Sequence, residues 1–173
     1  SVPSTTTPAS HDNLDGFDFA PVDFAPGDGV FESALYLATN PAGASSLSLG
    51  PADIAVVPQG RSTVSATAYA TATQMGLAPG DAIDALTMFD NSDLPEFDGG
   101  GNLITAVEPT EDYALFSLAP GSASLATHNL SAADVLYTDF SDFFAVYARA
   151  EELGLEPNAG GNPGPDNIEA LES

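Results

Sequence analysis

The sequence contains no cysteine, no lysine and no tryptophan, and each absence excludes a class of chemistry. Without cysteine, neither disulfide bonds nor thiolate catalysis are available. Two arginines stand against 25 acidic residues, which gives a formal net charge of −23. Binding of nucleic acid or of an anionic membrane surface requires a basic face, so both are excluded. No apolar run approaches the roughly 18 residues of a transmembrane helix, so membrane insertion is not expected.

Signals for catalysis are equally scarce. The chain has no Gly-x-Ser-x-Gly nucleophile elbow, and its only histidines, the residue type that most often acts as a base at neutral pH, are His11 and His128. A pair of carboxylates that suits glycoside hydrolysis can be found on paper in any chain with 25 acids. We therefore predict that the protein is not an enzyme and assign it no catalytic residue.

The composition that is present favours an exported globular protein. A hydrophobic fraction of 43% over 173 residues suits one domain, or two small lobes that share a core. So many acids repel one another unless cations screen or bind them. Residues 1–11 form a Ser/Thr/Pro-rich arm, and the chain starts at Ser1 instead of Met, from which we expect a secreted, extracellular or cell-surface protein. A cytosolic protein of a halophile would share the acidity.

Three copies of a short acidic motif divide the rest of the chain. These marker segments are Asp12-Asn-Leu-Asp-Gly16, Asp81-Ala-Ile-Asp-Ala-Leu86 and Asp166-Asn-Ile-Glu-Ala-Leu171. They are separated by 69 residues (81 − 12) and 85 residues (166 − 81). Such self-similarity predicts a tandem duplication, with a first unit at residues 12–80, a second at 81–165 and a strand stub at 166–173 that begins a further unit.

Four further blocks recur in the same order between the markers. They are Ala34-Leu-Tyr-Leu37 with Ala114-Leu-Phe-Ser-Leu118, Pro51-Ala-Asp-Ile54 with Ala132-Ala-Asp-Val135, Tyr69-Ala70 with Tyr147-Ala148, and Gly76-Leu77 with Gly154-Leu155. The order of the blocks supports the duplication.

Alternating apolar and polar residues, interrupted by Gly and Pro, predict short strands throughout both units. Strands are expected at residues 17–19, 22–24, 33–38, 54–57, the first half of 63–73, 83–89, 113–118, 135–137 and 143–147. Single helical turns are expected to end at Gly76 and Gly154. The predicted fold class is therefore all-β: two tandem homologous antiparallel units of about four strands each that share the marker strand.

Several runs in the second unit resemble a repeat of secreted bacterial proteins that often carry sorting tails of the PEP-CTERM type. They are Leu130-Ser-Ala-Ala-Asp-Val135, Phe144-Ala-Val-Tyr-Ala148, Leu153-Gly-Leu155 and Asp166-Asn-Ile-Glu-Ala-Leu171. The resemblance is weaker in the first unit and departs from the pattern at residues 61–73 and at Ala82, where the repeat favours Asn. It implies an exported β-domain and no established activity.

Two kinds of acidic site are candidates for cation binding. Calcium takes six to eight oxygen ligands, and the acidic loop before a glycine run offers Asp90, Asn91, Asp93, Glu96 and Asp98. The spacing is not that of an EF-hand, and a solvated acidic loop is the alternative. Asp18, Asp23 and Asp28 are weaker counterparts in the first unit.

The marker acids have two interpretations as well. The first acid of each marker can bridge a metal, or it can cap a turn by accepting backbone N–H groups while the following aliphatic residue enters the core. Asn129-Leu-Ser131 is, in addition, a glycosylation sequon.

Two functions follow from these patterns. Unfinished strands leave open sheet edges, which favours a structural subunit that assembles with itself into a filament or surface layer by strand sharing. The sharing residues would be Asp12, Leu14, Asp15, Asp166, Ile168, Glu169 and Leu171. The alternative is a monomeric, calcium-dependent binding module for a cell-surface polysaccharide. We interpret the aromatic residues as core and cross-strand pairs in preference to a sugar platform.

Overall fold

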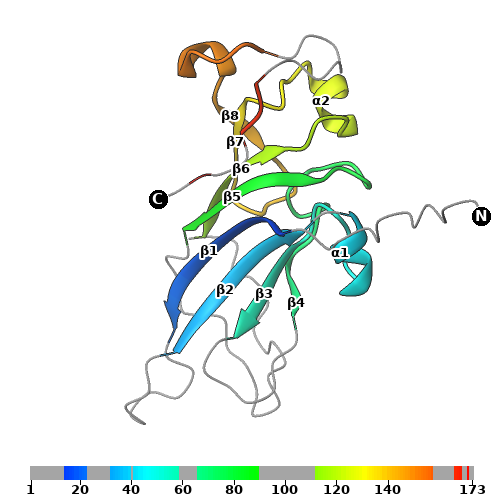
Figure 1. Cartoon of the computed structure of the whole chain (residues 1–173), viewed down its shortest axis with the longest axis vertical. Coiled ribbons are helices and arrows are strands. Elements are labelled where there is room, and N and C mark those ends of the chain that lie inside the picture. The colour runs from blue at the N-terminus through cyan, green and yellow to red at the C-terminus, as the bar shows by residue number, and fades with distance from the viewer. Residues whose placement is uncertain are drawn as a thin grey trace, which may run out of the picture.

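The computed structural model describes residues 14–22, 32–39, 41–58, 66–89, 112–157, 166–168 and 171. These residues form two four-stranded antiparallel sheets in which each strand pairs with the next along the chain (Figure 1). The first sheet contains β1 (Leu14–Val22), β2 (Glu32–Thr39), β3 (Ile54–Pro58) and β4 (Thr67–Ala70). The second contains β5 (Ile83–Phe89), β6 (Tyr113–Leu118), β7 (Val135–Thr138) and β8 (Ala145–Ala148). The predicted β fold is confirmed at this level.

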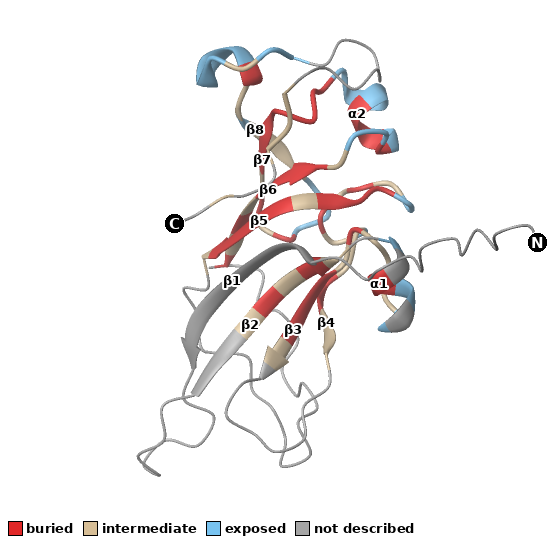
Figure 2. Ribbon diagram, viewed as in Figure 1, coloured by how far each residue is buried: buried red, intermediate tan, exposed pale blue. Residues whose placement is uncertain are grey.

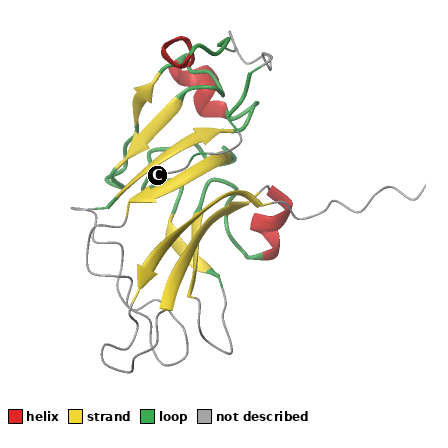
Figure 3. Ribbon diagram, turned by 60° about the vertical axis from the view of Figure 1, so that its left-hand side comes forward, coloured by secondary structure: helices red, strands yellow, loops and turns green. Residues whose placement is uncertain are grey.

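Two short α-helices lie where only turns were predicted. Helix α1 (Pro41–Ser46) follows β2, and α2 (Ala123–His128) follows β6, so that one helix accompanies each sheet (Figure 3). Each has six residues, too few to show a helical hydrophobic period in the sequence. The 3-10 turn η1 (Ala150–Leu153) ends at Gly154, as predicted. None of the helices among the described residues is long and apolar enough to span a membrane.

The ladders differ from the prediction in three further places. Two separate strands were expected at 17–19 and 22–24, but β1 continues through Pro21, which an edge strand tolerates because Pro lacks only a donor. The second marker segment leads into β5, which belongs to the second sheet and packs against β1 and β2 without joining their ladder. Residues 166–168, predicted as a strand stub, are not assigned to a strand.

The two sheets face each other across one hydrophobic core. Partners in an antiparallel ladder share a face, so the pairing of Tyr36 with Val56 defines the inner face of the first sheet. Phe116 pairs with Leu86 and with Leu136, and these three define the inner face of the second. All five are at most 1% exposed and belong to one cluster, and buried residues run along β3, β5, β6 and β7 (Figure 2).

The opposite faces are also apolar; their larger side chains are half-buried, whereas Ala55 on the first sheet and Ala85, Thr87 and Ser117 on the second are buried. The outer face of the first sheet carries Leu35, Leu37 and Val57. The outer face of the second carries Phe89, Tyr113, Leu115 and Tyr137. On that face the Phe89 and Tyr113 rings are stacked at 4.4 Å, and Tyr137 lies 5.7 Å from Tyr113. The predicted role in cross-strand pairs is confirmed for Tyr137, whereas Phe143 and Tyr147, for which the same role was expected, are 44% and 65% exposed.

Tyr69 on β4 contacts residues of both sheets and joins them. It is 5% exposed, and its hydroxyl donates a 2.6 Å hydrogen bond to Asp112 at the start of β6. Its ring also makes an edge contact with Phe140, after β7, at 5.8 Å. Just beyond β4, Asp142 N–H donates to the Gln74 carbonyl at 2.8 Å. Side chains and backbone of the second sheet therefore cover the end of the first.

Candidate assembly site

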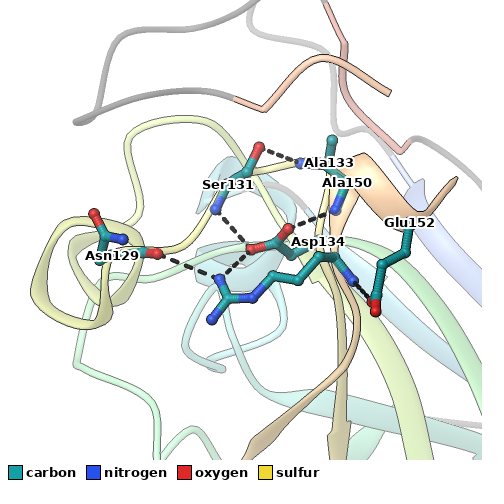
Figure 4. A network of polar contacts seen from close by, with 7 residues as sticks. Asn129, Ser131, Ala133, Asp134, Ala150 and Glu152 are labelled. Atoms are coloured by element: carbon teal, nitrogen blue, oxygen red, sulfur yellow. Dashed lines mark hydrogen bonds and ion pairs between the residues drawn. The ribbon is translucent and has the colours of Figure 1, made fainter. Parts of the chain in front are cut away.

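Two buried or half-buried aspartates hold the turns of the two sheets in the same way. Asp53 accepts the N–H of Gly50 at Oδ2 and the N–H of Ala72 at Oδ1, both at 2.8 Å. In the second sheet Asp134 accepts the N–H of Ser131 at Oδ2 and that of Ala150 at Oδ1, at 3.0 and 2.8 Å (Figure 4). Each carboxylate joins the turn before its sheet's third strand to the turn after its fourth. The sequence matched these aspartates as one block but did not indicate their role.

Arg149 closes the network around Asp134. Its Nη1 lies 3.1 Å from Asp134 Oδ2 and donates to the Asn129 carbonyl at 3.3 Å, while its backbone N–H donates to Glu152 (Figure 4). A shallow pocket of about 370 Å³ lies beside these groups and reaches Glu151 and Pro157. The guanidinium already pairs with one carboxylate and faces a second acidic residue. The arrangement therefore holds the turn together and offers little attraction to an anionic ligand.

Asp81, the first acid of the second marker, confirms the turn-capping interpretation. It is fully buried and accepts the N–H groups of Ala78 at 2.9 Å and Ser124 at 3.0 Å. The Ser124 hydroxyl donates to the same carboxylate at 2.5 Å. Ile83, the aliphatic residue of the marker, is 0% exposed and enters the core as predicted. The acid thereby anchors the start of β5 to α2.

The third marker docks on the second sheet of its own chain. Asn167 donates its side-chain N–H to Asp84 on β5 at 2.5 Å, and Ser117 on β6 donates its hydroxyl to the Ile168 carbonyl at 2.9 Å. Asp166 accepts the Glu156 N–H at 2.7 Å, which is again a turn contact. Ile168 and Leu171 are half-buried. Residues 166–168 therefore lie against the first two strands of the second sheet.

The third marker lies on the second sheet in the same way as the second marker lies on the first sheet. The second marker leads into β5, which packs against β1 and β2, the first two strands of the first sheet. Ile83 N–H also reaches the Pro51 carbonyl at 3.4 Å. Residues 166–168 contact β5 and β6, the first two strands of the second sheet. A marker segment thus packs on the first hairpin of the sheet that precedes it in both cases.

Other predicted site residues are separated from this region or lie outside the described residues. The calcium candidates Asp90, Asn91, Asp93, Glu96 and Asp98 and the assembly residues Asp12 and Glu169 all lie outside. Leu14 and Asp15 belong to β1, where Leu14 pairs with Thr39 beside an irregularity in the ladder. Among the described residues, no group of three or more His, Asp and Glu side chains is placed to hold a metal ion.

Asn129 and His128 lie at the end of α2, away from the docked segment. Asn129 is the exposed C-cap of α2, in a left-handed conformation that Asn tolerates well. This conformation accounts for an Asn at this position whether or not the sequon is glycosylated. His128 is exposed and makes an edge contact with the Phe144 ring at 5.1 Å.

Comparison of the chain with protein-family models, with curated protein sequences and with solved structures found no match.

Proposed function

We propose that the protein is a secreted, non-enzymatic structural subunit that assembles with copies of itself by exchanging the third marker segment between neighbours. The docking of residues 166–168 on β5 and β6 carries this proposal. Its hydrogen bonds join residues 83 and 51 positions apart in the chain, so they are tertiary contacts and not local turns.

Exchange of such a segment creates no new kind of contact. The bonds from Asn167 to Asp84 and from Ser117 to Ile168 are equally available when the segment comes from a neighbouring copy. Exchange of an identical element between protomers is a low-cost route to assembly. The docked position is then the closed form of a single molecule, and the exchanged position is its form in an assembly.

A duplicated architecture supports the same function. The aspartates Asp53 and Asp134 make equivalent bonds in sheets of equivalent strand order. The first hairpin of each sheet has an irregularity at the same place, after Leu14 and after Ile83. We interpret the two sheets as two copies of one unit, and units of this kind stabilise one another by stacking.

The remaining properties in the proposal come from the sequence. Secretion is inferred from the Ser/Thr/Pro arm and from the resemblance to repeats of exported bacterial proteins. The structural role is inferred from the contacts of three acids. Asp53, Asp81 and Asp134 all accept backbone N–H groups, so they stabilise turns of the fold. A catalytic carboxylate would instead face a cleft.

A mixing experiment tests segment exchange. Full-length chain is mixed with a chain that lacks residues 166–173, at high ionic strength, and assembly is followed by light scattering. We expect the truncated chain to remain monomeric alone and to cap the assemblies of the full-length chain, because its empty site on β5 and β6 accepts a neighbour's segment. If the truncated chain assembles alone as well as the full-length chain does, the exchange proposal fails.

A matched pair of variants makes the test specific to the docking contact. Asp84→Ala removes the acceptor for Asn167, whereas Asp139→Ala removes a carboxylate that bonds only locally to Ser141 among the interactions of the described residues. We expect the first to weaken assembly and the second to leave it unchanged.

A further inference from the structure

Two large apolar side chains at the end of the second sheet are exposed in a way that their counterparts in the first sheet are not. Tyr147 is 65% exposed and Leu153 is 47% exposed. The corresponding residues of the first sheet, Tyr69 and Met75, are 5% and 0% exposed. The same type of residue at the same place is thus covered in one sheet and open in the other.

The backbone bonds establish this correspondence independently of sequence similarity. Ala72 and Ala150 are equivalent because each donates its N–H to the aspartate of its own sheet. Tyr69 and Tyr147 lie three residues before these donors (72 − 69 and 150 − 147), and Met75 and Leu153 lie three residues after them (75 − 72 and 153 − 150).

The turns around these residues match as well. Thr71 N–H donates to the Gln74 side chain, and Arg149 N–H donates to the Glu152 side chain. Leu77 N–H donates to Ala72 O and Leu155 N–H to Ala150 O, both at 2.8 Å. The two turns therefore have the same construction, and they differ in what packs on them.

The second sheet is what covers the first of these turns. Tyr69 contacts Asp112 and Phe140. At Gly76 the backbone of the second sheet comes so close that a Cβ would lie 2.8 Å from the Cα of Phe143. At Gly154, the counterpart of Gly76, a Cβ would meet nothing within 4 Å. The second turn therefore has the shape of the first, but the sheet that would cover it is missing among the described residues.

The ladder register shows, in addition, which face of the first sheet corresponds to the outer face of the second sheet. Leu14 pairs with Thr39 and Ile83 with Leu118, so Thr39 corresponds to Leu118. Counting back three residues from each (39 − 36 and 118 − 115), Leu115 corresponds to Tyr36. Tyr36 points to the inner face of the first sheet, whereas Leu115 lies on the outer face of the second. The outer face of the second sheet is thus the equivalent of the face on which the second sheet packs.

We propose that the outer face of the second sheet, together with Tyr147 and Leu153, binds the outer face of the first sheet of a second copy, head to tail. The contact would repeat the part of the internal contact that covers Tyr69 and Gly76, because residues 166–168 already lie on β5 and β6. The receiving face carries Leu35, Leu37 and Val57, as apolar as the inner face of the second sheet that it would imitate. This inference rests on the self-assembly in the proposed function and names its surface. Because the two contacting faces differ, the contact is heterologous, and it gives an open filament when the rotation between successive copies does not close a ring.

The geometry of the aromatic row favours a protein partner over a sugar. Phe89 and Tyr113 lie at 11° with centroids 4.4 Å apart, so their ring faces are turned to each other. Each ring therefore has one face covered by its neighbour, and the apolar row that they form with Leu115 and Tyr137 suits packing against aliphatic side chains. The net charge of −23 opposes contact between copies, so assembly needs enough salt to screen it.

A complementation experiment tests the head-to-tail contact. Tyr147→Glu blocks the donor face, and Leu37→Glu blocks the receiving face. Each variant alone should associate at least about tenfold more weakly than the unaltered chain, because each buries an unpaired charge in its contact. Mixed in equal amounts in molar salt, the two retain one intact face of each kind and should form a complex of one copy of each, detected by analytical ultracentrifugation.

The outcomes separate this inference from segment exchange. Circular dichroism melting confirms that both variants fold, and Val57→Glu replaces Leu37→Glu if the latter does not. If the folded pair forms no mixed complex, or if Tyr147→Glu alone assembles as the unaltered chain does, the head-to-tail contact is wrong. Repeating the mixture with both chains truncated after residue 165 removes segment exchange, and a mixed complex that persists supports the face contact by itself.

Discussion

At the scale of single residues, several acids of the described part of the chain accept backbone N–H groups. Asp53, Asp81 and Asp134 each bind two backbone N–H groups, and Asp112 binds the Tyr69 hydroxyl. A buried carboxylate is tolerated only when such donors replace its hydration. Among the described acids, the buried Asp81 and Asp134 organise turns, whereas Asp142, Glu151, Glu152 and Glu156 are exposed.

The bond between Tyr69 and Asp112 gives the sharpest test at this scale. Tyr69→Phe removes one donor from a buried carboxylate and should lower the free energy of unfolding by about 1–3 kcal/mol in urea denaturation. Tyr147→Phe is the matched control, since Tyr147 occupies the corresponding position but is 65% exposed, and it should change stability by less than about 0.5 kcal/mol. Equal effects of the two substitutions would contradict the conclusion that the Tyr69–Asp112 hydrogen bond stabilises the packing of the two sheets.

At the scale of elements, two turns of the same construction meet different surroundings. Both turns end at a glycine with a positive φ, 71° at Gly76 and 76° at Gly154. A side chain in this region costs about 1–2 kcal/mol whatever surrounds it. Only Gly76 is also pressed against backbone of the other sheet. The difference between the two positions therefore measures how tightly the sheets pack.

Alanine at each glycine makes that measurement. Gly154→Ala should destabilise the monomer by about 1–2 kcal/mol, whereas Gly76→Ala should cost clearly more, because its Cβ would lie 2.8 Å from the Phe143 Cα. Thermal and urea unfolding of the two variants give the comparison. If the head-to-tail contact forms, Gly154→Ala should weaken assembly more than its small loss of stability explains. Equal stability of the two variants would show that the backbones are not in contact at Gly76.

At the scale of the whole molecule, charge dominates the expected behaviour. A formal net charge of −23 on 173 residues produces self-repulsion that the two arginines cannot neutralise. Salt at about 1 M shortens the Debye length to about 3 Å, compared with about 30 Å at 10 mM. We therefore expect the stability of the fold, and the association of copies proposed above, to depend on ionic strength.

We expect the melting temperature to rise between dilute buffer and 1 M NaCl, and an unchanged value would contradict this expectation. Calcium and magnesium chlorides compared at equal ionic strength separate screening from specific binding. A larger rise with calcium, accompanied by heat in calorimetry that chelator abolishes, would indicate a site such as the one predicted at residues 90–98. Equal effects of the two cations would point to screening alone.

The sequence by itself determined the fold class and the approximate positions of most strands. Period-two alternation predicted strands close to the observed ones, and the matched blocks paired Asp53 with Asp134, which make matching hydrogen bonds. The exclusion of nucleic acid by the acid excess stays a prediction. Helices α1 and α2 escaped prediction because six residues are too few to show a helical period. The match of Tyr36 with Phe116 was one residue away from the ladder register, since both are bulky residues of an inner face.

Only the tertiary structure decided which face of each sheet is inside, because a shift of one residue in a strand reverses every side chain. Tyr69 is buried because Asp112 and Phe140 of the second half of the chain cover it, whereas no sheet among the described residues covers its counterpart Tyr147. The tertiary structure also decided where the third marker lies, since the hydrogen bond from Asn167 to Asp84 joins residues 83 positions apart in the chain. Contacts over such distances depend on how the two sheets pack, and local patterns in the chain carry no information about them.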